Sequence, residues 1–173
     1  EDATLWVGAG FSKYAGYPLG SQLSEYIYNA FTSEEKKAVS KELPLAELCE
    51  EFILRRSRNQ LMQLLEKIFQ KKPNSLVHHK RLAQIPLVKT IVTTNYDNLF
   101  EFAFKGDVQK LVNNIDTSYI QDDKLALFKV HGDLIHPNSI VISSSDYYNF
   151  LNNKSQNNIY WSCVKSRLAN KAV

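Results

Sequence analysis

Short apolar or β-branched runs, separated by longer stretches of helical periodicity, are the main pattern of this chain. Runs at residues 5–7, 90–93 and 125–130 predict buried strands, and residues 140–142 predict a further one. Between the first two runs, residues 21–84 carry apolar positions at helical spacing and predict a helical insertion that acts as a cap. Strands that alternate with helices predict an α/β fold with a parallel sheet.

Three of the predicted strands end in polar turns. Gly-Ala-Gly-Phe-Ser at 8–12 follows the first strand, Thr-Asn-Tyr-Asp at 94–97 follows the second, and His131 with Gly132 follows the third. Ligands of open parallel sheets bind outside the carboxyl ends of the strands, so we expect the three turns to share one cleft. A glycine turn suits phosphates, Asn and Asp suit ribose hydroxyls, and His suits a base. The pattern therefore predicts a nucleotide-binding site that also carries catalytic side chains.

Each turn taken alone also has a simpler structural interpretation. The glycines can serve a tight turn only, because Lys13 stands where a dinucleotide fingerprint has its third glycine and no Gly-Lys-Ser/Thr follows. Asp97 can be a helix N-cap, Asn95 a turn former and His131 a hydrogen-bonded structural residue. The coincidence of all three at strand ends favours the functional interpretation.

Other chemistries fit the sequence less well. His78 and His79 are adjacent and would point about 100° apart on a helix, and His131 and His136 only loosely flank a turn. We therefore expect no catalytic metal. Ser12 lacks the second glycine of a nucleophile elbow, which disfavours a serine hydrolase.

Composition excludes several further classes. The 173 residues are 44% hydrophobic and 23% charged, which is typical of one globular domain. No apolar run is long enough to span a membrane, and no secretory signal is visible. A net charge of +3 gives no nucleic-acid footprint. Cys49 and Cys163 lie far apart, which excludes a cysteine-based zinc ribbon and favours a reducing, cytoplasmic location. Both ends look cut, so we expect residues 1–173 to be one domain of a longer chain.

Taken together, the motifs resemble the Sir2 family, and most closely its Sir2-like branch without zinc. Residues 8–18 resemble the family's Gly-Ala-Gly-x-Ser…Gly-x-Pro loop, and residues 94–97 its Gln-Asn-x-Asp motif. His131-Gly132 resembles the catalytic His-Gly, and residues 142–147 resemble the Ser/Thr-x-x-Asp-Tyr stretch of the Sir2-like branch. The match covers nearly the whole chain in the right order.

The chain also departs from the deacylases of that family. Thr94 stands in place of the Gln, and Leu-Gly-Ser at 19–21 replaces their Asp-Phe-Arg. It has no four-cysteine zinc module, and the family's next strand, which contacts the adenosine half of NAD, would lie beyond Val173.

The resemblance implies a three-layer Rossmann-like domain that binds NAD as its substrate and needs no zinc. It implies an NAD+ hydrolase that cleaves the nicotinamide–ribose bond to give nicotinamide and ADP-ribose, as an effector of bacterial antiphage defence. It also implies a homo-oligomer and a regulatory domain or partner protein outside these residues. Two alternatives stay open: an NAD-dependent protein deacylase, or a non-catalytic regulatory module that binds NAD or ADP-ribose.

The same resemblance assigns roles to the residues of the three turns. His131 is expected to be the general base, and Asn95 to orient the ribose or the attacking water. The residues expected to bind NAD are Gly8, Ala9, Gly10, Phe11, Ser12, Thr94, Asn95 and Asp97.

Overall fold

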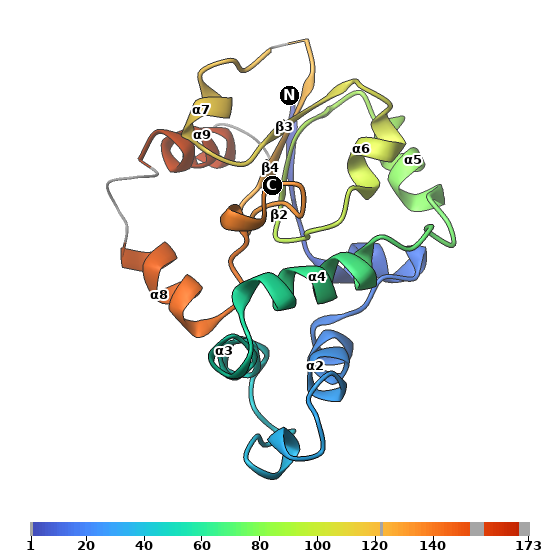
Figure 1. Cartoon of the computed structure of the whole chain (residues 1–173). Coiled ribbons are helices and arrows are strands. Elements are labelled where there is room, and N and C mark those ends of the chain that lie inside the picture. Colours follow the sequence, from blue (N-terminus) through green and yellow to red (C-terminus); the bar gives the residue numbers. More distant parts are fainter. Residues whose placement is uncertain (1, 122, 153–157, 170–173) are drawn as a thin grey trace.

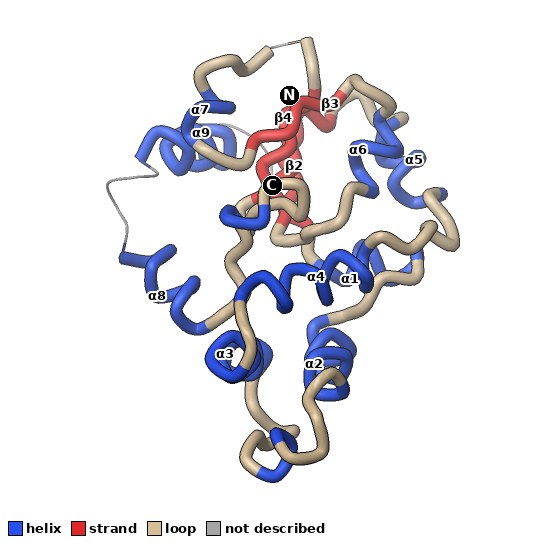
Figure 2. Tube along the Cα trace, viewed as in Figure 1, coloured by secondary structure: helices blue, strands red, loops and turns tan. Residues whose placement is uncertain are grey.

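A computed structural model describes residues 2–121, 123–152 and 158–169. At its centre lies a four-stranded sheet (Figures 1 and 2). The strands are β1 (Ala3–Val7), β2 (Val88–Thr93), β3 (Val108–Leu111) and β4 (Leu125–Lys129). They lie in the order β1-β2-β4-β3, and every neighbouring pair is parallel. All strands therefore end at the same edge of the sheet, as the sequence predicted.

Helices cover both faces of this sheet (Figure 1). On one face, α6 (Leu99–Phe104) packs through Phe100 onto Ile91 of β2, and Leu82 of α5 (Val77–Ala83) belongs to the same core. On the other face, α9 (Asn158–Ala169) packs through Val164 onto Val92, and α7 (Asn114–Thr117) lies beside α9. Because Ile91 and Val92 point to opposite faces, β2 is buried on both sides. The arrangement is the predicted three-layer Rossmann-like fold.

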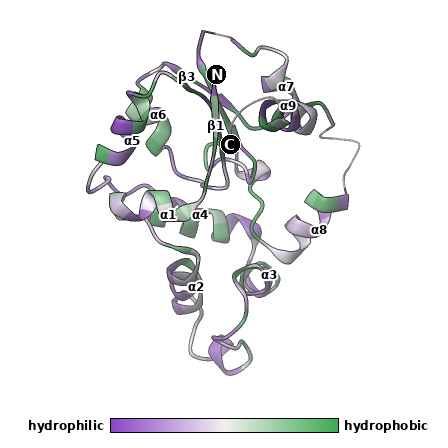
Figure 3. Cartoon of the chain, turned by 180° about the vertical axis from the view of Figure 1, so that it is seen from behind, coloured by the Kyte–Doolittle hydropathy of each residue, from purple (hydrophilic) through white to green (hydrophobic). Residues whose placement is uncertain are grey.

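Helices and 3-10 turns make up the regular structure between β1 and β2, the part of the chain for which the sequence predicted a helical insertion. It begins at the carboxyl end of β1 with α1 (Ala9–Ser12) and a 3-10 turn, η1 (Lys13–Ala15). It continues through α2 (Gly20–Asn29), the 3-10 turn η2 (Glu35–Lys37), α3 (Leu45–Arg55), α4 (Arg58–Phe69) and α5. Figure 3 shows polar and apolar residues mixed along α2 and α3, as expected for amphipathic helices.

Helices α2, α3 and α4 form a cluster with a hydrophobic core of its own. Ile27, Leu48 and Leu61, one from each helix, are completely buried in it. Helix α5 does not join this cluster, because Leu82 packs onto the sheet with α6 instead. The helical block is thus divided between the cluster and one layer of the sheet.

The prediction of a strand at residues 140–142 is wrong. Its backbone is anchored by hydrogen bonds from Val141 N to His131 O (3.0 Å) and from Ile142 N to Asp146 Oδ2 (3.1 Å), not by a neighbouring strand. Ile140 and Ile142 are buried in the core of the helical cluster. The apolar run therefore marks a linker packed on helices, which runs between η3 (Pro137–Ser139) and α8 (Ser144–Asn152). Within the described part of the chain, no helix is long and apolar enough to cross a membrane.

Candidate active site

The candidate site lies where the connections of two neighbouring strands diverge. The chain leaves β2 toward α6 on one face, whereas it leaves β4 toward α8 and α9, and α9 packs on the opposite face. A crevice at the carboxyl ends of such strands is the usual ligand site of open α/β sheets. The turn after β1 borders the same crevice, because Thr94 N donates to Val7 O (3.3 Å).

Side-chain hydrogen bonds join the turns after β1 and β2. Asn95 Nδ2 donates to Gly8 O (3.1 Å) and to Ser12 Oγ (3.0 Å), and the Ser12 hydroxyl donates to Asp97 Oδ2 (2.7 Å). All three side chains are buried. Asp97 Oδ1 also accepts a hydrogen bond from Leu99 N (3.1 Å), so this residue does support the start of α6, as the simpler interpretation proposed. Its other oxygen still belongs to the network.

Six of the predicted site residues come together around one cavity of about 180 Å³. They are Ala9, Ser12, Thr94, Asn95, Asp97 and His131. Aromatic rings of Tyr17, Phe69, Tyr96 and Tyr147 complete much of its wall. Mainly apolar walls with a few convergent polar groups are typical of small-molecule sites.

His131 sits in an aromatic setting. Its ring packs edge-on against Tyr147 (centroids 5.4 Å apart) and Phe150 (5.9 Å), both from α8. Burial lowers the pKa of the imidazole below its ordinary value of 6.5. The ring is therefore neutral at pH 7 and able to accept a proton.

Three predicted residues of the glycine turn lie outside the cavity lining. The Gly8 carbonyl accepts from Asn95, and the Phe11 N–H donates back to Gly8 O (3.0 Å). The Phe11 ring points into the core against His79 and Phe100, at centroid distances of 4.7 and 5.6 Å. Gly10 is exposed, and a Cβ there would have no atom within 4 Å. Its predicted contact with NAD would come from the backbone.

Lys129 and Asp133 belong to the support of the site, and sequence reasoning missed both. The Lys129 ammonium lies 2.6 Å from Asp133 Oδ2 and also donates to the carbonyls of Asp97 (2.8 Å) and Tyr96 (3.3 Å). Burial by itself would raise the pKa of Asp133, but the neighbouring Lys129 outweighs it and lowers that pKa. The only signal in the sequence was a lysine placed inside a strand, directly before the His-Gly turn.

Gly132 is required by the backbone of the turn that carries His131. Its φ is +87°, and a Cβ would overlap with the carbonyl of Ser139. In the described residues there is no group of three or more His, Cys, Asp or Glu side chains that could hold a metal.

Comparison with known proteins gives a consistent result. Residues 89–173 match the family model of the SIR2-like domain. The chain is 32% identical over 154 residues to the NAD(+) hydrolase ThsA of Bacillus cereus (strain MSX-D12), which covers 85% of this chain and 31% of that protein. It is 29% identical over 161 residues to NAD(+) hydrolase ThsA of Cytobacillus dafuensis, which covers 88% of this chain and 31% of that protein. It is 31% identical over 153 residues to NAD(+) hydrolase ThsA of Enterococcus faecium, which covers 84% of this chain and 31% of that protein.

The chain thus spans about a third of the length of these relatives. The domain match, the relatives and the three turns that meet at one edge of a parallel sheet agree with one another, and the chain carries a SIR2-like domain.

Proposed function

We propose that this domain hydrolyses NAD+ at the bond between nicotinamide and ribose, which yields nicotinamide, ADP-ribose and a proton. The observation that carries the proposal is the single cavity that brings His131 together with the Asn95–Ser12–Asp97 network. The similarity to proteins named NAD(+) hydrolase supports the choice of substrate.

Cleavage of this bond needs little help from the protein at the leaving group. The electron pair of the C–N bond returns to the pyridinium nitrogen, and nicotinamide departs neutral, so no strong general acid is needed. The ribose carbon passes through an oxocarbenium-like state, as in glycoside hydrolysis. The carboxylate of Asp97, close to that carbon in this proposal, would favour the developing positive charge.

The attacking water needs a base and an orienting group. Neutral His131 would take the water proton as the oxygen bonds to the ribose carbon, and then release it to solvent. General-base help of this kind is worth roughly 10²–10⁴ in rate. Asn95 Oδ1, which makes no hydrogen bond within the described residues, would accept from the water or from a ribose hydroxyl.

The test is nicotinamide release from NAD+, followed by chromatography on the full-length protein and on this domain. His131→Ala and Asn95→Ala should lose nearly all turnover, whereas the exposed His78→Ala should keep it. Turnover by His131→Ala equal to that of the unaltered protein would contradict the mechanism. Release only in the presence of an acyl peptide would indicate a deacylase, and saturable NAD binding without product would indicate a regulatory module.

The wider setting of the proposed activity follows from the family resemblance. We infer a zinc-independent, cytoplasmic, homo-oligomeric effector of antiphage defence, regulated by a domain or partner outside these residues. In infected cells, the full-length protein should deplete NAD+, and the His131→Ala protein should not.

A further inference from the structure

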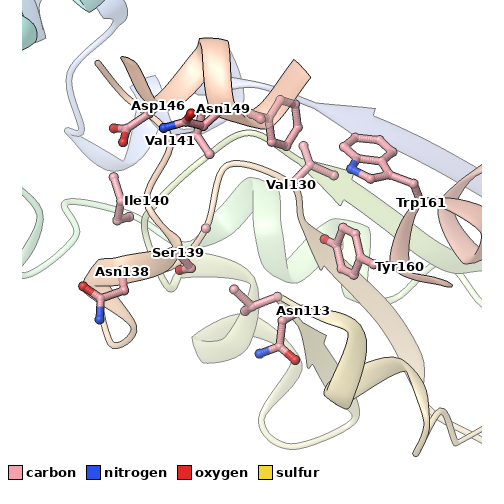
Figure 4. Close-up of a pocket in the computed structure, with 13 residues that line it drawn as sticks. Asn113, Val130, Asn138, Ser139, Ile140, Val141, Asp146, Asn149, Tyr160 and Trp161 are labelled. Carbon is pink, nitrogen blue, oxygen red and sulfur yellow. The ribbon is translucent and has the colours of Figure 1, made fainter. Parts of the chain in front are cut away.

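A second and larger cavity, of about 340 Å³, opens at the carboxyl ends of β3 and β4. Figure 4 shows the side chains around it. Those that carry the argument are Asn113, Asn138, Asn149, Phe150, Tyr160 and Trp161. Small-molecule sites occupy about 300–1,000 Å³, so the cavity is large enough for a compact ligand.

The two cavities share a wall. Successive residues after β4 face in opposite directions, so Val130 and Gly132 line the second cavity and His131 lines the first. The aromatic rings that flank His131 divide in the same way, because Tyr147 borders the first cavity and Phe150 the second. An occupant of the second cavity would therefore touch Phe150, which packs directly on the His131 ring.

Aromatic rings form one side of the second cavity. The ring of Trp161 packs edge-on against Phe150 (5.5 Å between centroids) and Tyr160 (6.0 Å), and all three border the open space. In Figure 4, Tyr160 and Trp161 stand on the opposite side from Asn138. Such rings suit a flat heterocycle, with which they make stacked or edge-to-face contacts.

Amide groups supply the polar recognition. The side-chain amides of Asn138 and Asn149 make no hydrogen bond within the described residues. Asn113 Oδ1 accepts from Ile115 N (2.8 Å) and Asp116 N (3.2 Å), whereas its Nδ2 donates to no group among the described residues. Asparagine amides pair with the edges of purine bases through one donor and one acceptor at once.

The described residues of the lining offer no cation to an anionic ligand. Among them the one charged residue is Asp146, and the Arg58 guanidinium already holds that carboxylate at 2.8 and 2.9 Å. No lysine or arginine lines the cavity in the described part of the chain. A phosphate would have no cation to bind there.

The geometry points to a binding site for an uncharged purine nucleoside in this second cavity, with adenosine as its simplest probe. The ligand is a nucleoside separate from NAD, because the diphosphate next to the adenosine of a dinucleotide would find no cation among the described residues of the lining. The inference does not depend on the proposed hydrolysis of NAD.

The chain has two tryptophans, Trp6 and Trp161, which makes the cavity observable. In a Trp6→Phe protein, tryptophan emission reports on Trp161 alone. Titration with adenosine should quench or shift this emission saturably, and AMP should bind more weakly because its phosphate finds no cation. Asn149→Ala in the same background should weaken adenosine binding about tenfold. Asn152→Ala, an exposed asparagine on the same helix whose side chain donates to Tyr148 O, should not.

Three binding results would overturn the site. The first is no saturable change with adenosine, and the second is tighter binding of AMP than of adenosine. The third is that Asn149→Ala and Asn138→Ala both bind adenosine as tightly as the Trp6→Phe parent. Nicotinamide release from NAD+ by the same Trp6→Phe protein separates a failure of this site from a failure of the proposed hydrolysis. Kinetics provide a further test. Adenosine should leave the KM for NAD unchanged, and a raised KM would show that adenosine competes with NAD and would contradict a separate nucleoside site.

Discussion

The ammonium group of Lys129 lies 2.6 Å from Oδ2 of Asp133, and neither side chain has any exposed surface. The same ammonium donates hydrogen bonds to the carbonyls of Tyr96 and Asp97, so the pair connects the turn after β2 to the turn after β4. His131 lies between the two paired residues in the sequence. The relative position of Asn95 and His131 in the candidate site therefore depends on this ion pair.

Removal of one partner of the pair should be costly. Lys129→Met leaves the Asp133 carboxylate buried, with the half-buried Lys110 ammonium, at 3.2 Å, as a weaker counter-charge. Breaking a buried pair in this way destabilises proteins by about 3–5 kcal/mol. Urea unfolding should show this loss for Lys129→Met, and the exposed Lys89→Met on β2 should change stability little.

The double variant Lys129→Met/Asp133→Leu separates charge from packing. If the unpaired carboxylate causes the loss, the double variant should be more stable than Lys129→Met alone. A double variant that is less stable than the single one would show instead that the Asp133 carboxylate stabilises the fold without Lys129, through its hydrogen bond from Ile135 N (2.8 Å) and its ion pair with Lys110.

Much of this fold could be predicted from the sequence, because short apolar runs report burial directly. The strands that end at Val7, Thr93 and Lys129 carried that signal, and so did the polar turns behind them. The convergence of Asn95 and His131 on one cavity followed from the rule that parallel strands end at one edge.

The parts that sequence could not show depend on partners far along the chain. The apolar run at 140–142 resembles a strand, but what buries Ile140 and Ile142 is the helical cluster. The role of Lys129 was missed because nothing in the local sequence indicates that its ammonium contacts Asp97 O and Asp133. The inward turn of Phe11 likewise depends on His79 and Phe100.

Ser12 is expected to matter as the link between Asn95 and Asp97. Ser12→Ala removes the acceptor of one Asn95 hydrogen bond and the donor to Asp97, at 3.0 and 2.7 Å. Loss of a buried partner costs about 1–3 kcal/mol, and misplacement of Asn95 should lower kcat more than it raises KM. Thermal unfolding and steady-state release of nicotinamide would measure both. Ser24→Ala, a half-buried serine on α2 outside the network, is the matched control, and equal kcat in the two variants would count against a role for the network.

The two glycines of the candidate site should respond differently to alanine. At Gly132 the positive φ and the overlap with Ser139 O make Gly132→Ala destabilising, by at least 1 kcal/mol. At Gly10 a Cβ meets nothing, so Gly10→Ala should fold as well as the unaltered protein. If the backbone at Gly10 approaches the diphosphate of NAD, Gly10→Ala should still raise the KM for NAD. An unchanged KM would remove Gly10 from the binding site.

Activity should tolerate mildly acidic pH better than an ordinary histidine would allow. Burial lowers the pKa of His131, so its proton-accepting form persists below pH 6.5 and kcat/KM should fall only under that value. Phe150→Ala exposes the ring to water and should move the acid limb of the profile up toward pH 6.5. An acid limb that stays in place would show that Phe150 does not cause the shift.

The same shift has a consequence for stability. The folded-state pKa of His131 lies below the unfolded value of 6.5, so the unfolded chain binds the proton more readily. The contribution of His131 to stability is complete above pH 6.5 and is lost as pH falls from 6.5 through the folded-state pKa. His79, whose pKa burial also lowers, acts in the same direction. Urea unfolding at pH 7.5 and 5.5 should show a smaller loss of stability at pH 5.5 for His131→Phe than for the unaltered protein.

The helical cluster should influence the site even though its centre lies away from it. Its core contains Tyr96 from the turn after β2, together with Ile140 from the linker that follows the His131 turn. Leu61→Ala empties a completely buried position in that core and should cost about 2–5 kcal/mol, whereas Leu54→Ala, 72% exposed, should cost little. Because Tyr96 is packed in this core, Leu61→Ala should lower the protection of the Asn95 and His131 amides from hydrogen exchange together with that of the α4 amides. If α4 alone loses protection while these amides keep theirs, the cluster unfolds independently of the sheet and does not hold the site.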